Sequence, residues 1–193
     1  PFKKKEVRQA LYQAIDIEAI KKKVMRGLSE PAGIITFPGV NGYTQDLDKR
    51  LPYDVDAAKK LLADAGYPKG FDVELRCPND RYVNDEAICT AVVGMLGKIG
   101  VNVNLFAQTK SKHFKELKED KGDFYMLGWG VPTLDSHYVF HYLYESGASW
   151  NKVNFSNSEV DAAIRVMEGE VDLDKRNAAI ANAWKIVKDD ISY

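Results

Sequence analysis

The sequence predicts an α/β fold in which a mostly parallel sheet is flanked by helices. Apolar and polar residues alternate over 71–75 and 101–105, and an unbroken apolar run occupies 124–127; both patterns are typical of strands. Helical patterns lie between these runs, at 84–99 and 113–119. Because strands that are joined through helices tend to pair in parallel, this order predicts a layered domain.

Helices are also predicted before the sheet. An apolar stripe at helical spacing marks the first of them, and it consists of Val7, Ala10, Leu11, Ala14 and Ile15. Asp16 is expected to cap a short second helix that Gly27 ends, and Asp54 is expected to begin a third. Glycine and proline residues within 28–52 predict an extended connection between the second and third helices.

The last third of the chain is predicted to be helical as well. The run at 124–127 is expected to be the most deeply buried strand, and a helix should follow it from Asp135 to Glu145. The segment 156–159 reads Ser-Asn-Ser-Glu, which is typical of a capping box, and Asp172 is expected to begin the final helix. We therefore expect residues 1–193 to form a single α/β domain with helical ends.

Composition narrows the class of protein. The chain has 193 residues, of which 45% are hydrophobic, and this is enough to bury a core. Its 27 basic and 28 acidic residues leave a net charge of −1, so a nucleic-acid partner is not expected. The chain opens at Pro1 without an initiator methionine, and we expect it to be a piece of a longer protein, so a missing leader says nothing of its compartment.

The sequence gives little sign of an enzyme. It contains no Gly-x-Ser-x-Gly, no Gly-x-Gly-x-x-Gly and no phosphate-binding loop motif, so neither a catalytic triad nor a cofactor is expected. Cys77 and Cys89 are too few for a disulfide scaffold or a cysteine-built zinc site. The simpler interpretation is that they are two unpaired, buried thiols.

The segment after the third predicted strand is a candidate ligand site. Gly128, Trp129 and Gly130 follow that strand, and ligands of open α/β sheets bind beyond the carboxyl ends of the strands. The glycines let the backbone approach a ligand, the indole offers a flat apolar wall, and Asp135 could pair with an ammonium group. The alternative is a tight strand exit with a core tryptophan and with Asp135 capping the next helix.

A second candidate lies in the loop between the first strand and the 84–99 helix. If the strands are parallel, Asn79, Arg81 and Tyr82 lie at the same edge of the sheet, where Arg81 could meet an acidic group of a ligand. The alternative is an ordinary connecting loop with a solvated arginine.

A third candidate is a metal site. In a helix, His137, His141 and Glu145 stand at i, i+4 and i+8 and share one face, and two imidazoles with a carboxylate suit zinc or nickel. This pattern supports an alternative function, a metal-dependent enzyme or metal-binding domain. The other interpretation is an aromatic-rich helix, since tyrosines are interleaved with the histidines at 138, 142 and 144.

The order of several motifs resembles one family. The motifs are Val-Arg-Gln-Ala-Leu at 7–11, Ala-Gly-Tyr-Pro-Lys-Gly-Phe at 65–71, Leu-Gly-Lys-Ile-Gly-Val at 96–101, Leu-Gly-Trp-Gly at 127–130 with Asp135, Phe-Ser-Asn at 155–157 and Asp-Lys-Arg at 174–176. Together they resemble the carboxyl-terminal lobe of family 5 solute-binding proteins of ABC importers, the peptide/nickel class. The resemblance covers essentially the whole chain.

This resemblance implies a periplasmic-binding-protein-like (type II) lobe. The whole protein would have two lobes that close on a peptide or related small solute and deliver it to an ABC permease in the membrane. The chain would be the second lobe, and its partner, the first lobe of the same protein, would be missing. It would have no enzymatic activity and bind no cofactor. The location implied is the periplasm, or the outer face of a Gram-positive cell through a lipid anchor.

The resemblance also implies roles for the candidate residues. The Gly128–Gly130 segment would offer backbone groups to an extended peptide, and Asp135 would pair with the ammonium group of the solute. The loop that contains Asn79, Arg81 and Tyr82 would supply a cation for its carboxylate. His137 stands where the family often has aspartate, which makes it a candidate specificity residue.

Overall fold

The computed structural model describes residues 1–193, which divide into two compact units. The first, here called the sheet unit, comprises Pro1–Pro31 and Leu51–Gly128; the second, the helical unit, comprises Ala32–Arg50 and Trp129–Tyr193. Each unit is described by itself. The expectation of a single domain over 1–193 stays a prediction. None of the helices combines the length and the apolar character needed to cross a membrane.

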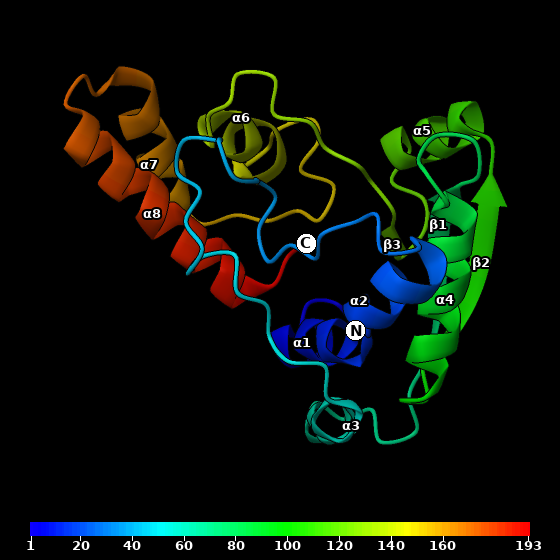
Figure 1. The fold of residues 1–193 in the computed structure, drawn as a ribbon. Coiled ribbons are helices and arrows are strands. Elements are labelled where there is room, and N and C mark those ends of the chain that lie inside the picture. The colour runs from blue at the N-terminus through cyan, green and yellow to red at the C-terminus, as the bar shows by residue number, and fades with distance from the viewer. The chain divides into compact units, whose positions relative to one another are not determined.

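The sheet unit contains a three-stranded parallel sheet, which confirms the predicted fold class. Its order is β2-β1-β3, where β1 is Asp72–Pro78, β2 is Asn102–Gln108 and β3 is Phe124–Tyr125. β1 is the central strand, and it pairs with β2 along its whole length, from Asp72 opposite Asn102 to Pro78 opposite Gln108. Figure 1 shows β1 and β2 side by side with a helix, α4, against them.

The prediction that 124–127 forms the most deeply buried strand is wrong. β3 is only two residues long, and both are half-buried. It pairs with β1 through Leu75 and Arg76 alone, and one further hydrogen bond, from Met126 N to Arg76 O (2.9 Å), continues the pairing. An apolar run without alternation cannot by itself distinguish a central strand from a short edge strand.

Six helical segments surround the sheet of this unit. They are α1 (Lys5–Ala14), α2 (Ile17–Ala19), the π-helical turn η1 (Ile20–Val24), α3 (Val55–Asp64), α4 (Asp85–Gly97) and α5 (Lys110–Lys118). Two predicted caps are confirmed, because the carboxylate of Asp16 accepts from Ala19 N and that of Asp54 from Ala57 N. The core joins apolar side chains of α1, α3, α4, β1 and β2, among them Val7, Leu62, Leu75, Leu96 and Val103.

A buried ion network lies between the sheet and α5. The guanidinium of Arg76 on β1 donates to Glu116 on α5 (3.0 Å) and lies over the ring of Phe106, 3.9 Å from its centroid. Gln108 on β2 also donates to Glu116 (2.8 Å), and this hydrogen bond together with the charge of Arg76 lowers the pKa of Glu116. The network fastens α5 to the carboxyl ends of β1 and β2.

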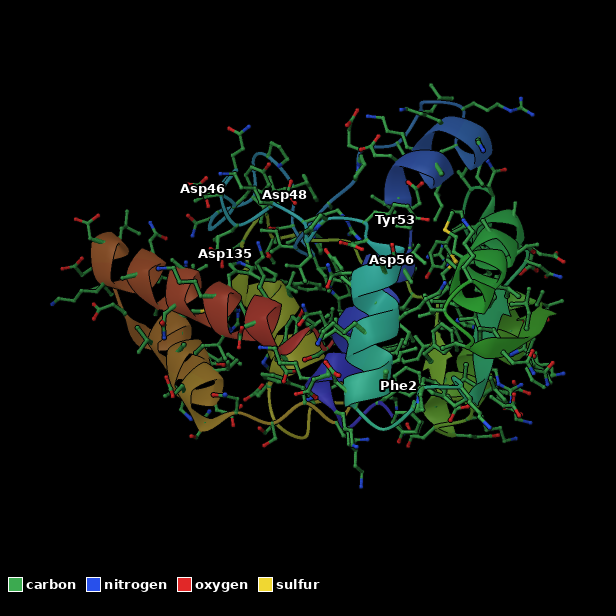
Figure 2. All side chains as sticks on the ribbon, turned by 90° about the horizontal axis from the view of Figure 1, so that it is seen from below. Phe2, Asp46, Asp48, Tyr53, Asp56 and Asp135 are labelled. Atoms are coloured by element: carbon green, nitrogen blue, oxygen red, sulfur yellow. A yellow bond between two sulfur atoms is a disulfide. The ribbon has the colours of Figure 1, made fainter.

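The cysteines form a disulfide, so the prediction of two unpaired thiols is wrong. Cys77 near the end of β1 and Cys89 on α4 are bonded, with their Cα atoms 6.5 Å apart, and Figure 2 shows the bond in yellow. Both residues are buried, and the sulfur of Met126 lies 3.8 Å and 3.7 Å from theirs. The spacing of two cysteines in the sequence does not reveal that a strand end and a helix face will meet.

The helical unit contains four helical segments. They are α6 (His137–Val139), the π-helical turn η2 (Phe140–Tyr144), α7 (Ser158–Gly169) and α8 (Leu173–Asp190). The predicted cap of α8 is confirmed, because Asp172 accepts from the backbone at positions 174 and 175. The capping box at 156–159 is not formed as predicted, since the cap of α7 is Asn157. α7 and α8 lie side by side (Figure 1).

The core of the helical unit is aromatic. Trp184 of α8 is buried, its ring centroid lies 4.6 Å from that of Phe140, and its Nε1 donates to Ser136 Oγ (3.1 Å). Ser136 Oγ in turn donates to Asn41 O (2.6 Å), so the loop before α3 is tied to the start of α6. A polar group placed among large rings is satisfied here by a chain of hydrogen bonds.

The disulfide provides a test of the sheet unit. We expect that reduction, or the double substitution Cys77→Ala/Cys89→Ala, lowers the free energy of unfolding by up to about 3 kcal/mol, the chain-entropy value for a loop of this length. Urea unfolding with and without a reductant measures the change. The double variant should not respond to the reductant, and a wild-type protein that also fails to respond would contradict the assignment of the disulfide.

Candidate functional site

The segment that leads from Trp129 to α6 is fixed by the loop that carries Asn41. Asn41 N donates to Leu134 O (2.8 Å) and Ser136 N donates to Asn41 O (3.1 Å), which forms a single parallel bridge between Asn41 and Asp135. Figure 2 labels Asp135 near the loop that carries Asp48. The backbone therefore holds the carboxylate of Asp135 at the start of α6.

This carboxylate is fully engaged within the helical unit. Arg176 of α8 binds it in a bidentate manner, with Nη1 to Oδ2 at 2.8 Å and Nη2 to Oδ1 at 2.9 Å. Asn41 Nδ2 donates to Oδ2 (3.0 Å), and His137 N donates to Oδ1 (2.9 Å). Bidentate, charge-assisted pairs are among the strongest hydrogen bonds in proteins. The side chain of Asp135 is 23% exposed and that of Arg176 is 17% exposed, so water competes little for their hydrogen bonds.

The pKa values reflect this pairing. Burial alone would raise the pKa of Asp135, but the hydrogen bonds from Arg176, His137 N and Asn41 outweigh it, and the pKa is lowered. The hydrogen bond to Asp135 raises the pKa of Arg176. Both groups are thus charged over the physiological range.

The contacts of Asp135 bear on its two predicted roles, which are pairing with the ammonium group of a solute and capping the next helix. Asp135 accepts from His137 N, the first residue of α6, but the N-cap residue of this helix is Ser136, so the predicted cap at Asp135 is not formed as expected. Its pairing with the ammonium group of a solute stays a prediction. Because Arg176 already offsets its charge, a solute would have to share this carboxylate with the guanidinium.

Trp129 lies in an aromatic cluster of the helical unit. Its ring centroid is 6.1 Å from that of Tyr138, 5.9 Å from that of Tyr142 and 5.9 Å from that of Trp150. Its indole Nε1 is buried and donates no hydrogen bond. A buried donor without a partner is energetically costly.

The two glycines beside Trp129 have different surroundings. A Cβ atom on Gly128 would lie 2.6 Å from the ring of Tyr82, so close packing within the sheet unit requires glycine there. A Cβ atom on Gly130 would have nothing within 4 Å. Open space beside Gly130 fits the prediction that its backbone is accessible, and its contact with a solute stays a prediction.

The loop at 79–84 is held by a buried carboxylate of the sheet unit. Asp85 accepts from Arg81 N and from Tyr82 N (2.9 Å each), and these hydrogen bonds lower its pKa although burial opposes the shift. Asn79 N donates to Gln108 O (2.9 Å) at the end of β2. The backbone of the predicted loop site is thereby ordered.

The side chains of Arg81 and Tyr82 in this loop differ in their contacts. Tyr82 reaches Gly128, with its hydroxyl 3.4 Å from Gly128 O. The side chain of Arg81 is exposed, and its guanidinium lies 5.1 Å from the centroid of the Tyr82 ring. The structure thus brings Asn79, Arg81, Tyr82 and Gly128 to one edge of the sheet unit, whereas Trp129, Gly130, Asp135 and His137 belong to the helical unit.

The predicted histidine group has a different third member. His137 and His141 are stacked, with ring centroids 5.6 Å apart, and their nitrogens lie within 4.8 Å of one another and of a carboxylate oxygen of Glu168 on α7. Glu145 lies past the end of η2, where its Oε2 is 2.9 Å from His141 Nδ1, and it is outside this group. The continuous helix expected to place Glu145 on the face of the two histidines is not formed, because η2 ends at Tyr144, and Glu168 is the carboxylate grouped with them. Glu145 as a metal ligand stays a prediction.

Sequence reasoning missed three residues that define these sites: Asn41, Arg176 and Glu168. Arg176 stands in the Asp-Lys-Arg motif used above, but nothing local indicates that it pairs with a carboxylate 41 positions earlier. Glu168 lies in an ordinary amphipathic helix. Only the packing of α7 and α8 against the start of α6 brings these side chains to the site.

Comparison with known proteins shows the family to which the chain belongs. The family model "Bacterial extracellular solute-binding proteins, family 5 Middle" matches residues 1–151, so the chain belongs to this family.

Individual relatives support the same family. The chain is 30% identical to heme-binding protein A of Haemophilus influenzae over 97% of its length and 35% of that protein. It is 30% identical to the dipeptide-binding protein of Escherichia coli over 81% of its length and 30% of that protein. The chain thus spans about a third of these relatives.

Solved structures confirm the type II periplasmic binding fold. The periplasmic binding protein DppA from Helicobacter pylori, in complex with the peptide STSA, superimposes with a TM-score of 0.89 and 22% identity. The match covers all of this chain and 38% of that protein. The fold predicted for this chain, including parallel pairing, is therefore confirmed.

The Asp135–Arg176 pair can be tested through stability. We expect Asp135→Asn to lower the free energy of unfolding by about 2 kcal/mol at neutral pH, because it leaves a half-buried guanidinium without its anion. Since the pKa of Asp135 is lowered in the folded state, the wild type should lose this contribution as the pH falls below the unfolded value of about 4.

Urea unfolding at pH 7 and pH 3 measures both effects. The matched control is Asp174→Asn, an exposed aspartate in the first turn of α8. A difference between Asp135→Asn and wild type that is the same at both pH values would contradict the ion pair as the source of the stability.

Proposed function

We propose that this chain is part of the substrate-binding component of an ABC importer, which binds a peptide or related small solute and delivers it to a membrane permease. The observation that carries the proposal is the family 5 match over residues 1–151. The relatives bear the names of binding proteins for dipeptides and for heme, and one solved neighbour holds a peptide. We propose accordingly that the chain has no catalytic step of its own.

The sheet unit offers a cation to the solute. Arg81 is exposed at the carboxyl edge of the sheet, and the loop that carries it is ordered by Asp85. An arginine held in this way can bind a carboxylate in a bidentate manner, which makes Arg81 the proposed partner of an acidic group. Tyr82, packed on Gly128, and Asn79 would line the same edge.

The helical unit offers an aromatic wall and main-chain groups. The indole nitrogen of Trp129 is buried without a partner, and the backbone at Gly130 faces open space. An extended peptide read through its main chain needs donors and acceptors of this kind, and such recognition tolerates many side chains. We propose that Trp129 and Gly130 contact the solute, with His137 as a specificity residue.

The proposal extends to the rest of the protein. A second lobe of the same chain would supply the other side of the cleft, and closure of the two lobes would trap the solute. The family description names bacterial extracellular proteins, so we propose the periplasm, or the outer face of a Gram-positive membrane through a lipid anchor.

Two substitutions test the proposed contacts in the complete protein. We expect Trp129→Ala and Arg81→Ala each to weaken peptide binding at least about tenfold, which corresponds to roughly 1.4 kcal/mol. Calorimetry with a panel of dipeptides and longer peptides measures the affinities. The matched controls are Val171→Ala and Lys59→Ala, which alter exposed side chains. The proposal would be overturned if the complete protein bound no peptide of the panel. It would also be overturned if both site variants bound peptide with the affinity of the wild type.

A separate experiment tests Asp135 as the partner of an ammonium group. Each peptide is paired with its N-acetylated form, which lacks that charge. If Asp135 binds the ammonium group, acetylation weakens binding to the wild type and has little further effect on Asp135→Asn, provided that circular dichroism shows the variant to be folded. If acetylation weakens binding equally in the wild type and in Asp135→Asn, another residue binds the ammonium group. Asp135 would then pair with Arg176 and not with the solute.

A further inference from the structure

His137, His141 and Glu168 form a cluster that the proposed solute function does not explain. His137 begins α6, His141 lies one turn later in η2, and Glu168 is near the end of α7. The ligand atoms of the three side chains all lie within 4.8 Å of one another. His137 Nε2 is 3.5 Å from Glu168 Oε1, and the cluster belongs entirely to the helical unit.

The ring nitrogens of this cluster are buried and unsatisfied. His137 Nε2 and His141 Nδ1 are both shielded from solvent, and neither makes a hydrogen bond of good geometry, although His141 Nδ1 lies 2.9 Å from Glu145 Oε2, within ion-pair distance. Each nevertheless faces a carboxylate oxygen, that of Glu168 for His137 and that of Glu145 for His141. Two imidazoles and two carboxylates thus converge, and such an arrangement is stabilised by positive charge, carried either by protons on the imidazoles or by a cation between the side chains.

The donor set selects the class of cation. Two imidazole nitrogens and a carboxylate oxygen suit zinc and the neighbouring divalent transition ions, whereas magnesium and calcium prefer oxygen ligands alone. Zinc binds at about 2.0 to 2.2 Å, so the side chains must move inward by rotation. They have room to do so, because their exposed fractions are 29% for His137 and 44% for Glu168.

The frame that carries these ligands is held in place by one residue. Arg176 binds Asp135, whose carboxylate accepts from His137 N, and its Nε donates to Met167 O (2.8 Å), next to Glu168. The backbones that carry two of the three ligands are therefore fixed to the same guanidinium. Such support from surrounding hydrogen bonds is what orients ligands in metal sites.

We propose that His137, His141 and Glu168 bind one divalent transition-metal ion of the zinc class. Three protein ligands leave a fourth position of the ion for water or for Glu145, whose Oε2 already touches His141. Arg165, with Nη1 3.7 Å from Glu145 Oε1, competes for this carboxylate, so Glu145 is the weaker candidate.

The test measures binding of Zn²⁺ alone to the purified protein without a histidine tag. We expect one ion per chain by calorimetry and by metal analysis after dialysis, with Mg²⁺ showing no comparable binding. Glu168→Gln and His141→Ala should each weaken Zn²⁺ binding at least about tenfold. No free thiol competes for the metal, since both cysteines are in the disulfide.

Two controls keep the outcome decisive. Glu159→Gln changes an exposed carboxylate on the same helix as Glu168 and should leave Zn²⁺ affinity unchanged. Glu168 is itself largely exposed, so Glu168→Gln should fold normally, and circular dichroism verifies this for both site variants. Absence of stoichiometric Zn²⁺, or equal affinity in wild type, Glu168→Gln and Glu159→Gln, would overturn the proposal. Peptide binding is measured separately, so the two proposals can fail independently.

Discussion

The helical unit depends on the guanidinium of Arg176. This one group binds both carboxylate oxygens of Asp135 and also the carbonyl of Met167 at the end of α7. Through Asp135 it fixes Asn41 and the first backbone amide of α6. Because α8 presents Arg176, three segments distant in the sequence, the 41 loop, the start of α6 and the end of α7, are held by one charge.

Such a pair is stable only when every partner is present. Removing two charges from water costs several kcal/mol, and their attraction offsets this cost only with good geometry and further hydrogen bonds. Asp135 has these, since Arg176, Asn41 and His137 N supply four donors. The consequence for function is direct. A carboxylate that is neutralised by its own protein attracts an external ammonium group less than an isolated aspartate would.

The features that the sequence predicted well are those that depend on residues close together in the chain. The caps at Asp16, Asp54 and Asp172 and the alternating strands β1 and β2 are confirmed, because each depends on side chains a few positions apart. The pairs Asp135–Arg176, Cys77–Cys89 and His137–Glu168 depend instead on how elements pack. The helix predicted from Asp135 to Glu145 is incorrect for a related reason, since the π-helical turn η2 ends at Tyr144 and changes the periodicity.

The electrostatics of the helical unit therefore differ from those that the sequence suggests. The sequence places cation binding at Asp135, the one acid of the glycine–tryptophan segment. In the fold Arg176 offsets that charge, whereas Glu168 and Glu145 face two histidine nitrogens that lack hydrogen bonds of good geometry. Arg165 Nη1 is 3.7 Å from Glu145 Oε1. The group proposed to bind a cation is thus the histidine pair, which begins two residues beyond Asp135.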